Sequence, residues 1–592
     1  MTKAAGKQAV LLGVNAFHGD SSACLVHGGR LIAAAEEERF RRIKHWAGFP
    51  SEAIRYCLEA GGLRLDDVDY LAVNHDPRAN LWEKSVYVLN HRPNPQLVLR
   101  RIMSRWRRAG VAERLDKAFP GQRFRGEVRH VEHHLAHLAS AFLVSPFDEA
   151  VCVSVDGFGD FASAAWGIGR MERIEIEGRV FFPHSLGIFY QAMTQYLGFP
   201  HYGDEYKMMG LAPYGEPRYL QQMQKIVQLR DDGSFQLDLA YFRHHQEKID
   251  YAWDDGSPSV GRLFTPALDE LLGPARRNDQ PLDAKHRDIA RSAQAMYEQA
   301  FFHLLNHVQR RYGLETLALA GGCAMNSVAN GKIYRQTPFR HVYIQSAAGD
   351  AGGAIGAAMA LWHRLNAGGR NGAMDHAYWG PEFSDTHIGE LLHKRGADID
   401  GRGCRIEEVP DEKDLCRRTA AYIAEGRVVG WFQGRMEWGP RALGNRSIVC
   451  DPRRADMKNI LNLKIKRRES FRPFAPSILR EAVTEWFETD DDVPFMMQVF
   501  QIREEKRPLI PAVTHVDGSG RLQTVHRGTN PRYYRLIESF RDLTGIPIVL
   551  NTSFNENEPV VCRPEEALDC FLRTQMDVLV MGSWMLTRTG TA

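Results

Sequence analysis

Short apolar runs separated by polar turns dominate the first 150 residues of the chain. Ala9–Val14 has the pattern of a buried strand, and Ala23–Val26 and Leu31–Ala35 predict two more strands. Ser51–Gly61 has helical spacing and ends at a Gly-Gly pair, and Tyr70–Val73 predicts a further strand. Because strands and helices alternate, the pattern predicts an α/β unit.

A second region of the same texture begins near residue 150. Val151–Val155 predicts a strand that runs into a Gly/Asp turn, and Phe161–Ile168 predicts its hairpin partner. Helices are expected over Gln294–Tyr312 and over the small-residue stretch Asp350–Leu365. The region therefore predicts a second α/β unit, although no fixed-period repeat is visible.

The periodic pattern stops at Leu365–Asp375 (LNAGGRNGAMD), a Gly/Asn-rich stretch typical of a linker. After it, strands and helices flank a long run of mixed Arg, Lys and Gly. We expect two α/β domains. The first covers residues 1–368, with halves of about 1–149 and 150–368, and the second covers residues 375–592.

Composition narrows the class of protein. The 592 residues include 75 Lys and Arg against 73 Asp and Glu, and the net charge of +2 excludes a chain-wide basic coat for nucleic acid. No apolar run approaches the ~18–20 residues of a membrane span, and the first residues resemble neither a signal nor a transit peptide. The nine cysteines include no CxxC pair, so a disulfide framework is not expected. We expect a soluble cytoplasmic protein with neither membrane nor nucleic acid among its partners.

The segment EHHLAH carries a metal-binding pattern. His133 and His137 lie one helical turn apart, so both imidazoles can reach one ion. His303 and His307 have the same spacing, and we interpret them as the polar edge of a long helix. The first pair is favoured because a strand ending at Asp156 follows it, and open α/β sheets place ligands at strand ends.

Glycine-rich turns follow several predicted strands. In Asp156–Asp160 (DGFGD), glycines let backbone N–H groups approach a phosphate, although an ordinary β-turn has the same composition. Gly321 and Gly322 let a flat ring or a ribose lie against bare backbone, and Asn326 stands where it can cap a helix. Asp350 is either a carboxylate ligand or another helix cap.

Basic residues gather after the linker and alternate with aromatic residues and prolines, which are poor surface residues. Guanidinium groups suit phosphate and carboxylate, and lysine supplies a point charge; a solvated basic face is the alternative. A second basic run, Arg92–Arg129, is interpreted as a solvated helical face. The cluster after the linker comprises Arg435, Arg441, Arg446, Lys464, Lys466, Arg467, Arg468, Arg472 and Arg521.

Together these motifs resemble the nodulation/cephamycin/tobramycin O-carbamoyltransferase family. The matching segments span nearly the whole chain in one order, which makes the set far more specific than any one of them. They include GVNAFHGDSSACLV (Gly13–Val26), VEHHLAHLASAF (Val131–Phe142), VDGFGD (Val155–Asp160), AGGCAMN (Ala320–Asn326), GRMEWGPRALGNRSI (Gly434–Ile448), ESFRPFAPSI (Glu469–Ile478) and LNTSFN (Leu550–Asn555).

The resemblance implies an actin-like ATPase (ASKHA) fold, duplicated, for the N-terminal domain and a YrdC-like α/β fold for the C-terminal domain. The C-terminal domain would form carbamoyl-adenylate from carbamoyl phosphate and ATP with Mg²⁺, releasing pyrophosphate and phosphate. The N-terminal domain would bind the adenylate through a metal, usually iron(II), with Mn or Zn as alternatives. It would pass the carbamoyl group to a hydroxyl of a small acceptor, since the family decorates antibiotics, sugars and macrolides.

The same resemblance implies residue roles, carried over by position. The metal ligands would be His133, His137, Asp156 and Asp350. The adenylate would be held by Gly157, Gly159, Gly321, Gly322 and Asn326. Carbamoyl phosphate and ATP would be held by Arg441, Lys466, Arg472, Arg521 and Ser553. His18 is expected at the acceptor hydroxyl as a general base, and Lys44 is a second candidate for that pocket.

Other functions fit parts of the pattern. A tRNA threonylcarbamoyl-type transferase shares the metal and nucleotide motifs, and the Arg92–Arg129 run would be its RNA contact, but the near-neutral charge argues against it. A zinc peptidase would carry HExxH, whereas His134 follows His133 here. A non-catalytic nucleotide-dependent binding protein of the actin/chaperone type would not need the arginine-rich second domain. A homodimer is a possible assembly that no sequence feature selects.

Overall fold

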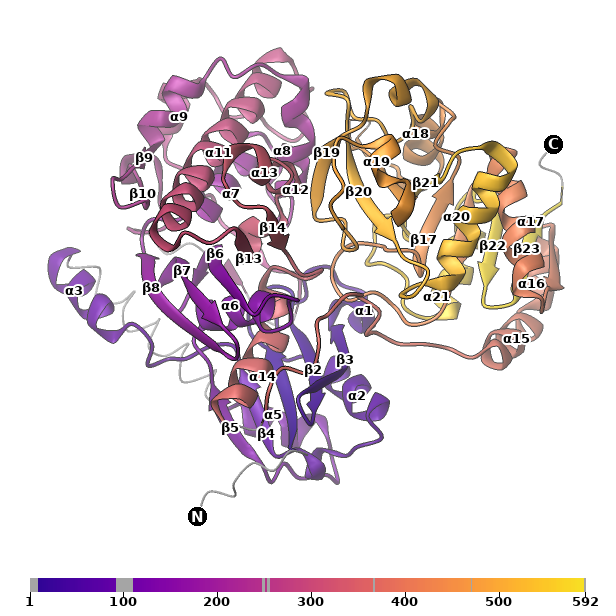
Figure 1. Ribbon diagram of the computed structural model, residues 1–592, viewed down its shortest axis with the longest axis horizontal. Coiled ribbons are helices and arrows are strands. Elements are labelled where there is room, and N and C mark those ends of the chain that lie inside the picture. The colour runs from indigo at the N-terminus through magenta and orange to yellow at the C-terminus, as the bar shows by residue number, and fades with distance from the viewer. Residues whose placement is uncertain are drawn as a thin grey trace. The chain divides into compact units, whose positions relative to one another are not determined.

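The computed structural model describes residues 9–91, 110–246, 251–252, 256–365, 368–469 and 471–589. The chain forms two compact units, Met1–Met374 and Asp375–Ala592 (Figure 1). The predicted helical face at Arg100, Arg101, Arg105 and Arg108 lies outside the described residues.

The first half of the first unit is built on a five-stranded sheet of order β3-β2-β1-β4-β5. β1 pairs antiparallel with β2 and parallel with β4, and β5 continues the parallel side. All six residues of β1 are buried, as expected for a central strand covered on both faces. The strands are β1 (Val10–Asn15), β2 (Ser22–His27), β3 (Arg30–Glu36), β4 (Tyr70–Val73) and β5 (Glu127–His130). The helices are α1 (Glu38–Arg41), α2 (Ser51–Ala60), α3 (Leu81–His91), α5 (Val111–Ala118) and α6 (His133–Phe142).

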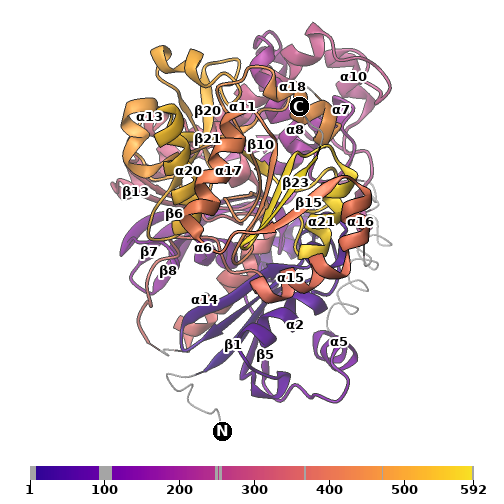
Figure 2. The same cartoon turned by 90° about the vertical axis from the view of Figure 1, so that its right-hand side faces the viewer.

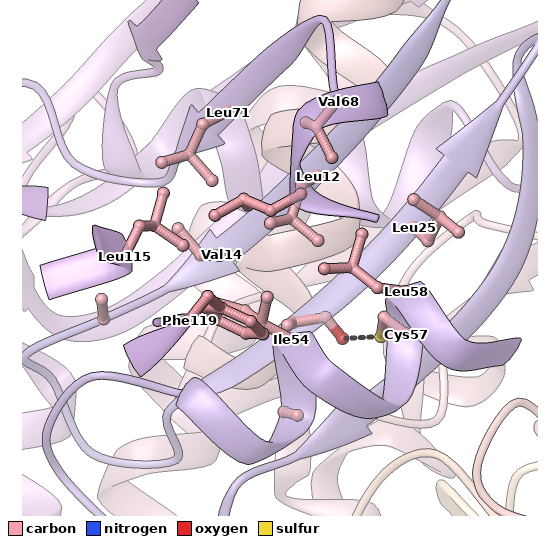
Figure 3. Close-up of a cluster of buried hydrophobic side chains, with 14 of the residues drawn as sticks. Leu12, Val14, Leu25, Ile54, Cys57, Leu58, Val68, Leu71, Leu115 and Phe119 are labelled. Atoms are coloured by element: carbon pink, nitrogen blue, oxygen red, sulfur yellow. Dashed lines mark hydrogen bonds between the residues drawn. The ribbon is translucent and has the colours of Figure 1, made fainter. Parts of the chain in front are cut away.

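A hydrophobic core holds α2 and α5 against this sheet (Figure 3). Leu12 and Val14 of β1 belong to one buried cluster with Ile54 and Leu58 of α2 and Leu115 of α5. Burying each of these side chains contributes about 1.5–3 kcal/mol. The core therefore fixes the sheet whose strand ends carry the site described below.

The second half repeats this topology with the order β14-β13-β6-β7-β8. β6 pairs antiparallel with β7 and parallel with β13, as β1 pairs with β2 and β4. The predicted α/β fold with a duplicated N-terminal part is confirmed. The strands are β6 (Glu149–Gly159), β7 (Ala162–Arg170), β8 (Arg173–Phe181), β13 (Thr316–Ala320) and β14 (His341–Tyr343).

Two helices, α6 and α14 (Gly353–Arg364), join the halves. α6 ends the first half and packs on β6 and β13 of the second sheet, whereas α14 ends the second half and packs on β1 and β2 of the first. The two helices also contact each other. Figure 2 shows α2 and α14 on opposite faces of the first sheet. Each sheet thus positions a helix that belongs to the other half.

Two of the remaining helices of the second half, α7 and α11, contact β6, and α8 and α9 pack on α11. The helix predicted over Gln294–Tyr312 begins earlier, at Ala284, where the Asp283 side chain caps it. The prediction missed this start because the first turns are polar and lack apolar periodicity. Two small hairpins pair β9 (Val227–Leu229) with β10 (Phe235–Leu237) and β11 (Tyr251–Ala252) with β12 (Ser259–Val260). The helices are α7 (Leu186–Tyr196), α8 (Glu205–Leu211), α9 (Leu220–Ile226), α10 (Pro266–Leu272), α11 (Ala284–Tyr312), α12 (Ser327–Asn330) and α13 (Ile333–Gln336).

The second unit contains a nine-stranded sheet of order β15-β23-β22-β16-β17-β21-β18-β20-β19. α17 and α20 pack on each other beside its central strands, and α21 contacts β16 and β22. The strands are β15 (Cys404–Glu408), β16 (Val429–Phe432), β17 (Arg446–Cys450), β18 (Ala475–Leu479), β19 (Gln498–Gln501), β20 (Ser519–Val525), β21 (Ile548–Ser553), β22 (Val578–Met581) and β23 (Trp584–Arg588). The helices are α15 (Asp385–Lys394), α16 (Gly396–Gly401), α17 (Glu412–Ala424), α18 (Met457–Ile460), α19 (Val483–Trp486), α20 (Pro531–Thr544) and α21 (Pro564–Arg573).

The described part of the predicted linker, residues 368–374, is attached to the first unit. Arg370 donates to the carbonyl of Phe142, 3.0 Å away, and Asn371 donates to the carbonyl of Gly28 over 2.9 Å. The Met374 carbonyl accepts from the Tyr343 hydroxyl. These contacts place the change from one unit to the next after residue 374.

Candidate functional site

The candidate site lies where the parallel strands of both sheets end. In each sheet the carboxyl ends of parallel neighbours meet at one edge, which is where open α/β sheets bind ligands. The His18 turn follows β1, and Asp156 stands near the end of β6. Gly321 follows β13 directly, and Asp350 lies beyond β14.

Helix α6 presents two histidines to this edge. The Glu132 side chain caps the helix by accepting from the Leu135 N–H over 2.8 Å. His133 and His137 are then one turn apart, and their Nε2 atoms lie 3.0 Å from each other. His134 faces the other way, with Nδ1 2.9 Å from the Ser154 hydroxyl, and burial lowers its pKa to about 3. His134 is therefore a neutral packing residue.

Two carboxylates complete the cluster. The register of β6 against β7 shifts between Val155 and Gly159, and this irregularity carries Asp156 out of the regular ladder. Asp156 Oδ2 lies 3.1 Å from His133 Nε2. Asp350 begins a 3₁₀ turn after β14, does not cap a helix through its side chain, and places Oδ1 3.4 Å from His137 Nε2.

The four groups have the spacing of a metal site. One ligand atom from each of His133, His137, Asp156 and Asp350 lies within 4.8 Å of all the others. Two ligand atoms about 2.1 Å from one ion, at right angles, lie about 3.0 Å apart, close to the Nε2–Nε2 separation. Two imidazoles and two carboxylates suit Fe, Mn or Zn. The residues present fit the expected metal.

The charges in the cluster are strongly coupled. Burial lowers the pKa of His137, but the carboxylates of Asp156 and Asp350 outweigh burial, and the pKa is raised to about 9. Burial works to raise the pKa of Asp156, but the two imidazoles hold it well below its usual range. Burial and the charge of Asp156 raise the pKa of Asp350. A bound cation would supply the positive charge that these acids otherwise draw from the imidazoles.

The glycines expected at the adenylate also shape the metal cluster. A Cβ on Gly159 would lie 2.0 Å from the His133 ring, whereas one on Gly157 would meet nothing within 4 Å. Gly321 has φ +90° and approaches the Val155 backbone. The Gly322 N–H donates to Asp156 Oδ1 over 2.7 Å, and a Cβ on Gly322 would lie 2.8 Å from that oxygen. Gly159, Gly321 and Gly322 therefore have structural reasons to be glycine beside any contact with a nucleotide.

Asn326 makes contacts within the protein. Its side-chain oxygen accepts from the Ala329 N–H over 3.1 Å and caps α12. Its amide nitrogen donates to Gln294 of α11 over 3.0 Å. The capping role considered for this residue is present, and its contact with adenosine stays a prediction.

The turn after β1 brings His18 to the cluster. Its ring centroid lies 6.0 Å from that of His133. Lys44 is exposed, beside His45, whose Nδ1 lies 2.7 Å from Asp20 Oδ1. Asp20, Glu38 and His45 form a second group of possible metal ligands, but the ion pair between Glu38 and Arg39 already supplies a cation there.

His75 was missed from the sequence, and Asp160 was named only as part of the DGFGD turn. His75 and Asp160 lie in contact, with His75 Nδ1 2.5 Å from Asp160 Oδ1. The His75 ring is also 6.1 Å from that of His18. Their signal was present, because His75 closely follows the end of β4 and Asp160 directly follows β6.

In the second unit, Lys466 and Ser553 come together. The buried Lys466 ammonium lies 3.3 Å from the hydroxyl oxygen of Ser553 and 2.5 Å from the backbone carbonyl oxygen of Ser553. It also donates to the Asn555 side-chain oxygen over 2.6 Å. Ser553 ends β21, so this predicted pair again stands at the end of a strand.

The arginines predicted for carbamoyl phosphate and ATP also gather. Burial lowers the pKa of Arg521, and the charges of Arg441, Arg468 and Arg472 lower it further. Arg472 forms an ion pair with Glu469 at 3.6 Å. Four mutually repelling guanidinium groups favour an anionic ligand such as a phosphate.

Other arginines of the basic cluster are structural. Arg446 is fully buried and donates to the carbonyls of Gln433 and Pro381 over 2.6 and 3.0 Å. Burial lowers its pKa to about 10. Arg435 donates to the Trp379 carbonyl over 2.9 Å. Composition alone does not distinguish these residues from the phosphate-binding candidates.

Within the part of the chain that the structure describes, every helix is too short or too polar to cross a membrane. The nine cysteines, Cys24 to Cys570, are all free thiols.

Comparison with known proteins identifies the family. The model called Carbamoyltransferase N-terminus matches residues 10–359, and Carbamoyltransferase C-terminus matches 420–588. An uncharacterized protein of Synechocystis sp. is 42% identical, and the match covers 98% of this chain and 97% of the Synechocystis protein. Nodulation protein NolNO of Sinorhizobium fredii is 38% identical, and the match covers 97% of this chain and 80% of NolNO. The solved structure of T. kodakarensis HypF is 14% identical with a TM-score of 0.31, and the match spans 60% of this chain and 48% of HypF. The chain belongs to the carbamoyltransferase family.

Proposed function

We propose that the protein is an ATP-dependent O-carbamoyltransferase with two separate sites. The second unit would form carbamoyl-adenylate from carbamoyl phosphate and ATP, and the first would transfer the carbamoyl group to a hydroxyl of a small-molecule natural product. One observation carries this proposal. The buried His133, His137 and Asp156 form a cluster with the partly exposed Asp350, in a chain matched by both carbamoyltransferase models.

In the second unit, Arg441, Arg472 and Arg521 would neutralise the phosphates of the two substrates. Lys466 and Ser553 would bind a neighbouring phosphate oxygen. The burial of Lys466 supports this role, because hydrogen bonds from charged donors strengthen where water is excluded. Mg²⁺ would accompany ATP.

In the first unit, the four-residue cluster would hold a divalent metal, for which we propose iron(II), with Mn or Zn as alternatives. Such a metal supplies Lewis-acid stabilisation of the negative charge that develops on a leaving adenylate phosphate. Gly157 would present its N–H to that phosphate, since no atom crowds its α-carbon. Gly159, Gly321, Gly322 and Asn326 would line the adenylate, and His18 and Lys44 would face the acceptor.

Paired variants test the division of labour. His133→Ala should lose the bound metal and carbamoyl transfer but keep carbamoyl phosphate-dependent pyrophosphate release. Arg521→Ala should lose pyrophosphate release, by about 10²-fold or more for a lost transition-state donor, and keep its metal. Metal content by mass spectrometry and pyrophosphate release report the two sites independently. His303→Ala, in the other HxxxH pair, is the control. Loss of both readouts in either folded variant would contradict two separate sites.

A further inference from the structure

The loop after β4 is held firmly at the edge of the metal cluster. Asn74 is buried and donates to the Asn15 side chain over 3.1 Å, which ties the loop to β1. His130, at the end of β5, places Nδ1 2.7 Å from the His75 carbonyl. The backbone that carries His75 is therefore fixed from both neighbouring strands.

Asp160 fixes the side chain of His75. Its carboxylate is fully shielded from solvent, and Oδ2 accepts from the N–H groups of Asp76 and His133 over 2.8 and 2.9 Å. Oδ1 lies 2.5 Å from His75 Nδ1. Asp160 also has φ +48°, an uncommon conformation for a residue other than glycine, and such conformations cluster at functional sites.

The geometry around Asp160 orients the His75 ring. Asp160 Oδ2 already accepts from two backbone N–H groups, so Oδ1 is the oxygen that faces His75 Nδ1. A carboxylate oxygen at Nδ1 accepts a hydrogen bond from the imidazole tautomer with the proton on Nδ1. The lone pair of His75 is then on Nε2, the position of a general base.

The position of His75 suits an incoming acceptor. Its side chain is 19% exposed, and its ring lies 6.1 Å from His18, which in turn lies 6.0 Å from the metal ligand His133. The Nε2 atom of His18 is shielded from solvent. The partly exposed His75 side chain therefore stands beside the His18 turn, next to the cluster.

We propose that His75, oriented by Asp160, is the general base of carbamoyl transfer. This inference rests on the proposed function. The acceptor oxygen bonds to the carbamoyl carbon, and the bond from that carbon to the adenylate phosphate oxygen breaks. The hydroxyl proton passes to His75 Nε2, and the electron pair of the broken bond leaves with AMP. Asp160 acts through His75 and is a positioning residue.

His75→Gln tests the proposal in the full-length, metal-loaded protein. Transfer should fall about 10²–10⁴-fold, the usual contribution of a general base. Metal content and carbamoyl phosphate-dependent pyrophosphate release should stay within twofold of the unsubstituted protein. Transfer is measured to a sugar oligomer, an aminoglycoside and a macrolide, and as AMP formation with water as the acceptor. His341→Gln, at an exposed histidine that begins β14, is the matched control.

Chemical rescue separates a base from a structural residue. Imidazole added to His75→Ala should restore transfer at least tenfold, because it can take up the same proton. Asp160→Asn should lower transfer without such rescue, since the His75 ring still fills the position.

Three results would overturn the proposal, and they differ from a failure of the proposed function. Transfer by His75→Gln within twofold of the unsubstituted protein would remove His75 from the chemistry. Loss of metal together with transfer, or no rescue of His75→Ala, would make it a structural residue. If the unsubstituted protein releases no pyrophosphate with carbamoyl phosphate, the proposed function has failed instead.

Discussion

At the scale of single residues, close approach decides which glycines the metal cluster needs. Gly159 and Gly157 share one turn, yet only a Cβ at Gly159 would collide with His133, at 2.0 Å. This contrast offers a matched pair of substitutions within three residues.

Gly159→Ala should displace the His133 ring and lower metal retention by about 10-fold or more, while Gly157→Ala should retain the metal. Metal content after dialysis, measured against protein concentration, gives the comparison. Equal retention in both variants would show that the His133 position does not depend on Gly159.

A second residue-scale prediction concerns His45. Burial lowers its pKa, but the Asp20 carboxylate outweighs burial and raises the pKa to about 9. A group whose pKa is higher in the folded than in the unfolded protein stabilises the folded state while the group is protonated. For His45 this contribution is complete below the unfolded pKa of ~6.5 and is lost as the pH rises through about 9.

His45→Asn should therefore lower the free energy of unfolding by about 1–3 kcal/mol at pH 6, with little difference from the parent near pH 10. Asparagine suits the positive φ of this residue. Denaturant unfolding at the two pH values measures the effect, with His341→Asn as the control. A cost that is the same at both pH values would rule out the charged pair.

At the scale of elements, the placement of α6 depends on α14. Gly356 of α14 faces α6 so closely that a Cβ would lie 1.8 Å from the Ala136 carbonyl oxygen. The helix that carries both histidines of the cluster is thus positioned by a glycine far away in the sequence.

Gly356→Ala should lower the free energy of unfolding by about 1–3 kcal/mol or more through overpacking, and weaken metal retention. Gly396→Ala, in α16 with nothing within 4 Å of the added Cβ, should change stability by at most about 1 kcal/mol. Thermal unfolding of both variants gives the comparison. A neutral Gly356→Ala would mean that the two helices can move apart without cost.

The elements also show what could be predicted from the sequence. The helix of His133 and His137 and the strand ending at Asp156 follow from local spacing, so their proximity could be predicted. For Asp350 the sequence left two roles open, a carboxylate ligand or a helix cap, because its approach to the cluster depends on parallel pairing of β13 with both β6 and β14. The start of α11 was missed because its first turns are polar and lack apolar periodicity.

The role of a basic residue cannot be predicted from composition, because it depends on what surrounds the side chain in the fold. Arg446 and Arg521 look alike in the sequence, but backbone carbonyls bind the first and other arginines surround the second. The contact of His75 with Asp160 joins loops from the two halves of the first unit, so neither local pattern revealed it.

At the scale of the whole molecule, the account assigns two reactions to two units. The arginines proposed to bind phosphate and the cluster proposed to bind a metal belong to different units. Each site should therefore respond to its own substrate. In the proposed function the activation step comes first, and it would consume carbamoyl phosphate before any acceptor is needed.

Pyrophosphate release by the purified, metal-loaded protein with Mg²⁺ and ATP tests this account most directly. The measurement compares reactions with and without carbamoyl phosphate, in the absence of an acceptor. The account predicts release that requires carbamoyl phosphate. Release that is equal in both reactions, or none in either from folded protein, would contradict it.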